Sequence, residues 1–148
     1  MNRTVSTGGH ADPSTLANIG MFAGVPKRDL RYVAEQFRVE WFKRGETIVR
    51  EGDPGARLFV LTEGEARVVS AEGRTRKRLG KGSIIGELSI IDPAPRNFTV
   101  EAVSDVSAVS VSSTAFLALL QDQPMIARAV MRILVRRLRD VEAATWAH

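Results

Sequence analysis

Residues 37–111 are divided into short apolar runs, and this regular division is the strongest constraint on the fold. The runs are rich in Val, Ile and Phe, and turn-forming segments separate them at intervals of roughly ten residues, a spacing typical of a β-sandwich or barrel. The expected strands are residues 38–42, 47–50, 58–61, 66–70, 75–79, 97–102 and 107–111. Residues 58–61 are apolar on both faces, which predicts a strand buried on both sides.

Helical patterns lie on both sides of this region. Residues 14–36 predict short helices interrupted by two glycines and Pro26. Residues 113–144 predict two helices, because Pro124 interrupts the first and suits the start of the second, which we expect to cover 124–144. The expected fold class is therefore mainly β with flanking helices (α+β): an antiparallel β-roll or jelly-roll barrel with N-terminal helices and two C-terminal helices.

The length of 148 residues suits one domain with one core. Residues 1–13 are polar and glycine-rich, and we expect them to form a disordered tail before a domain that covers 14–148. That tail has no apolar segment of the kind that a signal peptide needs, and no apolar run in the chain is long enough to cross a bilayer. We therefore expect a cytoplasmic protein with no membrane partner.

Residue types that carry catalysis are scarce. The two histidines, His10 and His148, lie near opposite ends of the chain, and there is no cysteine. Phosphate-binding P-loop and nucleophile-elbow motifs are absent from the sequence, and its carboxylates do not form a metal-ligand set. The sequence therefore predicts no enzyme activity, no catalytic residue, no metal site and no cofactor.

Residues 82–100 combine features that suit an anionic ligand. Gly86 lets the main chain approach a ligand or adopt an unusual dihedral angle. The residues after it can form one helical turn whose free amides attract an anion, and Arg96 can hold the same anion with its planar guanidinium. Glu87 beside such a site suits a hydroxyl donor, for example a ribose 2′-OH. On these residues alone, the alternative is a surface loop with an Arg–Glu pair.

Two motifs in this order resemble the cyclic-nucleotide-binding domain family, which includes protein kinase A regulatory subunits, cyclic-nucleotide-gated channels and the catabolite activator protein. The family's phosphate-binding cassette, Phe-Gly-Glu-Leu/Ile-Ala-Leu, a short loop and Pro-Arg-x-Ala-Thr-Val, is similar to residues 85–90 and 95–100 here. The family's Gly-Glu-x-Ile-x-x-Glu-Gly-Asp-x-Gly signature is similar to residues 45–55. The resemblance covers the chain from Leu16 to about Val141.

The resemblance implies a cyclic nucleotide, cAMP or cGMP, as the ligand. Glu87 is expected to accept a hydrogen bond from the ribose 2′-OH, and Arg96 to pair with an exocyclic phosphate oxygen. Main-chain amides near Leu88 and Ser89, with that of the residue after Arg96, are expected to complete the anion site. The expected binding residues are Gly86, Glu87, Leu88, Ser89, Arg96 and Asn97.

The cassette departs from the family pattern at three positions. Ser89 replaces the usual Ala, which adds a hydroxyl, and Asn97 follows the arginine where other members have Ala or Thr, so the choice between cAMP and cGMP stays open. Phe98 replaces a small Ala. Its ring either enters the core or narrows the pocket; strand alternation favours the core, because neighbouring side chains point to opposite faces.

The resemblance predicts a sensor that transmits ligand occupancy through its C-terminal helix to a protein effector in trans. A seam of apolar residues on this helix either packs on the barrel or supports a homodimer through residues 124–144. The seam consists of Ala127, Met131, Leu134, Leu138 and Val141. The basic clusters at residues 74–81 and 128–139 are expected to be solvated, and nucleic acid is not expected as a partner.

Two alternatives stay open. The chain could be a truncated transcription regulator of the catabolite-activator type, whose helix-turn-helix module would follow the long helix. It could also be a degenerate, ligand-free domain that acts in protein interaction, which the bulky Phe98 suggests.

Overall fold

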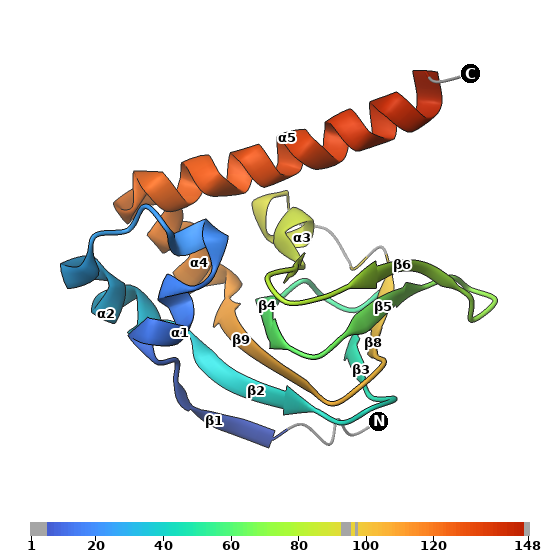
Figure 1. Ribbon diagram of the computed structural model, residues 1–148, viewed down its shortest axis with the longest axis horizontal. Coiled ribbons are helices and arrows are strands. Elements are labelled where there is room, and N and C mark those ends of the chain that lie inside the picture. Colours follow the sequence, from blue (N-terminus) through green and yellow to red (C-terminus); the bar gives the residue numbers. More distant parts are fainter. Residues whose placement is uncertain (1–5, 93–95, 97, 147–148) are drawn as a thin grey trace.

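The computed structural model describes residues 6–92, 96 and 98–146. Its centre is a roll of two antiparallel sheets, not closed into a barrel (Figure 1). One sheet has the order β1-β2-β9-β4-β7 and the other has the order β3-β8-β5-β6. The strands are β1 (Ser6–His10), β2 (Arg38–Phe42), β3 (Thr47–Val49), β4 (Arg57–Glu63), β5 (Ala66–Val69), β6 (Thr75–Leu79), β7 (Ile84–Ile85), β8 (Thr99–Ala102) and β9 (Val106–Ser112).

α1, α2 and α4 gather at one end of the roll, α3 lies between the sheets and α5, and α5 starts beside α4 and passes above the roll, its C-terminal end away from the sheets (Figure 1). They are α1 (Pro13–Ala17), the short 3-10 helix η1 (Gly20–Phe22), α2 (Lys27–Glu35), α3 (Glu87–Ile91), α4 (Ser113–Asp122) and α5 (Pro124–Trp146). Local sequence explains two of the starts: Asp12 accepts a hydrogen bond from the Ser14 amide at α1, and Ser112 accepts one from the Ala115 amide at α4. The expected β-roll with flanking helices is confirmed.

β4 separates two hydrophobic cores. Leu58 and Val60 face the core between the five-stranded sheet and the helices, whereas Phe59 and Leu61 face the core inside the roll. All four are buried, so the prediction of a strand covered on both faces is confirmed.

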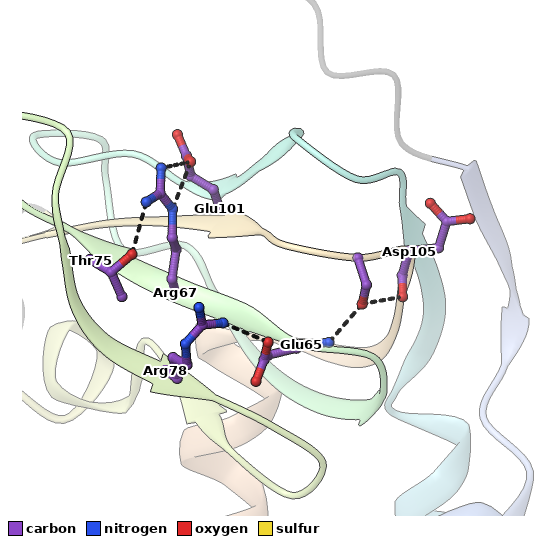
Figure 2. Close-up of polar contacts among 7 residues, drawn as sticks. Glu65, Arg67, Thr75, Arg78, Glu101 and Asp105 are labelled. Atoms are coloured by element: carbon purple, nitrogen blue, oxygen red, sulfur yellow. Dashed lines mark hydrogen bonds and ion pairs between the residues drawn. The ribbon is translucent and has the colours of Figure 1, made fainter.

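Ion pairs across the second sheet add side-chain links to the main-chain ladder (Figure 2). Arg67 on β5 lies opposite Glu101 on β8, and its Nη2 is 2.8 Å from the carboxylate. Arg78 on β6 pairs with Glu65 at 2.7 Å. β6 is an edge strand of this sheet, and the side chains of its first four residues are exposed.

The expected disordered tail at residues 1–13 is wrong for its second half. β1 pairs with β2, with Ser6 opposite Trp41, and the Ala11 amide donates to the Phe37 carbonyl at 3.0 Å. Gly8 is part of the reason, because a Cβ there would lie only 2.8 Å from the ring of Trp41. Pairing through the main chain needs no apolar side chains, so composition gives no sign of it. Residues 1–5 lie outside the described residues.

α5 is buried only near its start. Ile126 and Val130 are buried, and Leu134 packs partly against the helix-side core. Ala127 is partly buried, but three residues of the predicted seam are exposed: 58% for Met131, 58% for Leu138 and 62% for Val141. The interpretation that the whole seam packs on the roll is therefore wrong. Within the described residues, no helix has the length and apolar character needed to cross a membrane.

Candidate ligand-binding site

Gly86 and Arg96 are in direct contact at the end of β7. Gly86 has a φ of +98°, in the left-handed region that favours glycine. A Cβ at this position would overlap Nη1 of Arg96 and would lie 2.9 Å from the carbonyl oxygen of Arg57. Two reasons therefore favour glycine at this position: its backbone angle, and the guanidinium that occupies the space of a side chain.

Two main-chain carbonyls hold the guanidinium of Arg96. Its Nη1 donates to the Gly86 carbonyl at 3.4 Å, and its Nη2 donates to the Arg57 carbonyl. Arg96 is only 5% exposed. Burial lowers the pKa of Arg96, and the negative charge of Asp53 opposes this effect. A buried cation whose bonded acceptors are neutral carbonyls suits an anionic ligand.

The two motifs found in the sequence meet at Arg96. The Arg96 amide donates to the Asp53 carbonyl at 2.8 Å, and the Gly52 amide donates to the Arg96 carbonyl at 2.8 Å. A pocket of ≈ 190 Å³ lies beside this junction, with Arg50, Asp53, Arg57 and Arg96 among its lining residues. The segment at residues 45–55 thus holds the main chain of the cassette arginine.

Glu87 is the first residue of α3 and is 2% exposed. Its Oε1 accepts a hydrogen bond from Nη1 of Arg137. Its Oε2 is buried and has no hydrogen-bond partner among the described residues. Leaving a charged acceptor buried and unpaired is costly, so this oxygen marks a place where a donor from a ligand would be stabilising.

Arg137 is a site residue that the sequence did not single out. It extends from α5, and its Nη2 also donates to the Ile84 carbonyl at 3.1 Å. Burial lowers the pKa of Arg137. In the sequence this residue is one of several arginines on the last helix, and only the fold brings it to Glu87, 50 positions away.

The structure brings Arg96 into contact with Gly86, the residue directly before Glu87. Leu88 and Ser89 lie in the short helix α3, as the expected helical turn requires. Asn97 lies outside the described residues. Phe98 is partly buried and packs against the core inside the roll, as expected, although the expected strand at 97–102 begins only at Thr99, so strand alternation is not the reason.

Comparison with known proteins decides the family. The model of the cyclic nucleotide-binding domain family matches residues 39–123. This chain belongs to that family. The cyclic nucleotide-binding domain is 34% identical over 128 residues to the CRP-like cAMP-activated global transcriptional regulator of Mycobacterium tuberculosis, an alignment that covers 84% of this chain and 57% of the relative. The chain spans about half the length of the curated relatives it matches first.

Solved structures agree with this assignment. A cyclic nucleotide-binding domain from Methylobacillus flagellatus is similar to this one with a TM-score of 0.78 and 26% identity, covering 92% of this chain and 84% of the other. The catabolite activator protein of Thermus thermophilus is similar with a TM-score of 0.76 and 27% identity, covering 85% of this chain and 61% of the other. The cyclic nucleotide-binding domain therefore has the β-roll fold of its family.

Proposed function

We propose that this domain binds a 3′,5′-cyclic nucleotide, cAMP or cGMP, between Glu87 and Arg96 and reports its occupancy through α5. The buried, unpaired Oε2 of Glu87 carries the proposal. A ribose 2′-OH supplies the donor that this oxygen lacks, and the cyclic phosphate of the same molecule supplies an anion for Arg96. A ligand with only one of these groups would satisfy only one side of the site.

Arg96 is the proposed phosphate residue. A guanidinium has five N–H donors, and Nη1 and Nη2 of Arg96 each donate one hydrogen bond to a main-chain carbonyl. A phosphate oxygen carries charge, so its hydrogen bond with Arg96 would contribute about 1.5–3 kcal/mol. The amides of Leu88 and Ser89, with that of Asn97, are the proposed additional donors.

Arg137 is the proposed link between the ligand and α5. It bonds the same carboxylate that would accept the ribose hydroxyl, and it also bonds the β7 carbonyl of Ile84. Beyond Val130 the described part of α5 has no buried residue, so this contact is a main tether of its second half. A ligand that changes the environment of Glu87 therefore shifts the populations of conformations that differ in the position of α5.

The exposed apolar stripe on α5 is the proposed partner surface. Met131, Leu138 and Val141 lie along one side of the helix and are more than half exposed. Large exposed apolar side chains in a row indicate a surface that another chain covers. We propose a homodimer through α5, or a protein effector in trans on the same stripe.

A second candidate is the regulatory part of a transcription regulator. The relative in Mycobacterium tuberculosis carries that name, and this chain aligns with 57% of its length. On this proposal the ligand site is the same and the effector is a DNA-binding module. A gel shift of the full-length gene product against DNA, with and without cAMP, distinguishes the two; DNA binding only by a longer product would favour the regulator.

The ligand-free alternative is not favoured, because Glu87 and Arg96 both stay buried.

Isothermal titration of the protein with cAMP, cGMP and 2′-deoxy-cAMP tests the proposal. At least one 3′,5′-cyclic nucleotide should bind, and 2′-deoxy-cAMP should bind more weakly than cAMP because it cannot donate to Glu87. The ligand should be recovered unchanged, since a binding module does no chemistry on it. Absence of binding by every cyclic nucleotide would rule the proposal out.

A further inference from the structure

A buried carboxylate lies on the face of the five-stranded sheet that points into the roll, and its residue is not among those proposed to touch the ligand. Glu40 on β2 is 0% exposed, and strand alternation places it on the same face as Phe42, whose ring lies in the core inside the roll. Its Oε2 accepts a hydrogen bond from the hydroxyl of Ser110 on β9, which is also 0% exposed. Burial of an ionised carboxylate is costly, so its position calls for a physical reason.

Two arginines surround this carboxylate. Nε of Arg38 is 3.5 Å and Nε of Arg57 is 3.9 Å from Oε2 of Glu40. Nε of Arg57 also donates to the hydroxyl of Ser110 at 3.1 Å. The side chain of Arg57 is therefore held at two points, one on β2 and one on β9.

The main chain of Arg57 holds Arg96. The Arg57 carbonyl accepts the hydrogen bond from Nη2 of Arg96, while the other side of the guanidinium contacts Gly86. Arg57 is the first residue of β4. One residue thus joins the buried Glu40–Ser110 pair, through its side chain, to the cassette arginine, through its carbonyl.

We infer that Glu40 and Ser110 are positioning residues: they fix Arg57, and Arg57 fixes the guanidinium of Arg96 in the direction of the phosphate. This inference rests on the proposed function. Arg side chains have many rotamers, and a clamp that is held before binding loses less conformational entropy when the anion arrives. Loosening Arg57 would therefore weaken binding without removing any group that touches the ligand.

Ser110→Ala and Glu40→Gln test the inference, with affinity for cAMP measured by isothermal titration. Each variant should bind cAMP about three- to tenfold more weakly, the equivalent of losing roughly one hydrogen bond. Ser107→Ala is the matched control. Ser107 is on the same strand, three positions from Ser110, so its side chain points to the opposite face of the sheet. It should bind cAMP as the wild type does, with all variants first checked for a cooperative melting transition.

A double-mutant cycle separates positioning from a general loss of stability. If Ser110 acts through Arg96, then Ser110→Ala should have almost no further effect on cAMP affinity in an Arg96→Ala background, because coupled residues are not additive. Full additivity of the two losses would overturn the inference. Wild-type affinity in folded Ser110→Ala and Glu40→Gln proteins would also overturn it.

A measurement without ligand keeps the two proposals distinguishable. Relaxation of the ¹⁵Nε nucleus of Arg96 by NMR should report a more mobile guanidinium in Ser110→Ala than in the wild type or in Ser107→Ala. If the wild type bound no cyclic nucleotide, the proposed function would fail while this comparison would still decide whether Ser110 positions Arg96. Equal order parameters in all three proteins would contradict the positioning role.

Discussion

Arg137, in the second half of α5, donates a hydrogen bond to the carboxylate of Glu87, the first residue of α3. This contact joins the longest helix of the domain to the cassette that is proposed to bind the ligand. The other oxygen of Glu87 has no partner among the described residues. Glu87 thus bonds α5 through one oxygen, and its second oxygen is the one proposed to accept from the ligand, so the helix contact and the proposed ligand contact share one carboxylate.

Replacement of Arg137 by alanine should destabilise this junction. Glu87 would lose the hydrogen bond to its Oε1, and because Arg137 is 37% exposed, solvent screening limits the expected loss of unfolding free energy to about 1–2 kcal/mol. Hydrogen–deuterium exchange should show faster exchange in the second half of α5. Arg136→Ala is the control, since Arg136 is exposed; equal exchange in the two variants would contradict the tether.

Arg96→Ala should weaken cyclic-nucleotide binding by about ten- to a hundredfold, because a charge-assisted hydrogen bond in a partly dry site contributes roughly 1.5–3 kcal/mol. Arg96→Lys should recover only part of the affinity, since an ammonium group cannot match the planar fork. Titration calorimetry measures both. Arg128→Ala, on the exposed side of α5, should bind as the wild type does.

Gly86→Ala should impair the site more than an ordinary glycine substitution. The added Cβ would overlap the guanidinium of Arg96 and would be held at a φ of +98°, a strained angle for alanine that costs about 1–3 kcal/mol. We expect a lower melting temperature and lower cyclic-nucleotide affinity. Gly80→Ala is a matched control, because a Cβ at Gly80 meets nothing within 4 Å and its φ is not positive. Equal effects of the two changes would argue against the packing of Arg96 on Gly86.

Leu138→Glu should prevent self-association if α5 forms a homodimer. Leu138 is 58% exposed, so the charge should leave the melting temperature of the domain nearly unchanged. Light scattering coupled to size-exclusion chromatography should then report a dimer for the wild type and a monomer for the variant. Arg128→Glu also places a glutamate on the exposed surface of the helix, with a larger change of charge, and should keep the wild-type mass. A monomeric wild type would leave the effector as the partner of the stripe.

Much of the fold follows from local sequence patterns. The turn spacing predicts β2, β5 and β6 closely, and the doubly apolar run predicts that β4 is buried on both faces. The cassette predicts the meeting of Gly86 and Arg96, because both lie within one short loop and its flanks. In each case the information lies within a few residues along the chain, where spacing and side-chain type determine the local structure.

The contacts that sequence reasoning missed join distant segments. β1 pairs with β2 through main-chain groups, which have no side-chain signature. Arg137 meets Glu87, and Ser110 meets Glu40, only because the roll and the last helix bring those elements together. Glu40 is the clearest example, since a glutamate within a strand ordinarily indicates a solvent-facing position, whereas here it is covered by Arg38 and Arg57.

The outermost strand of the smaller sheet has a consequence for how molecules of this domain behave at high concentration. Among the described residues no strand pairs with the outer edge of β6, so a second copy could add a strand there. Arg76 and Lys77 are exposed on that strand, so two such edges would bring like charges together. Uncontrolled strand addition is thereby discouraged, and encounters between copies are left to surfaces elsewhere on the molecule.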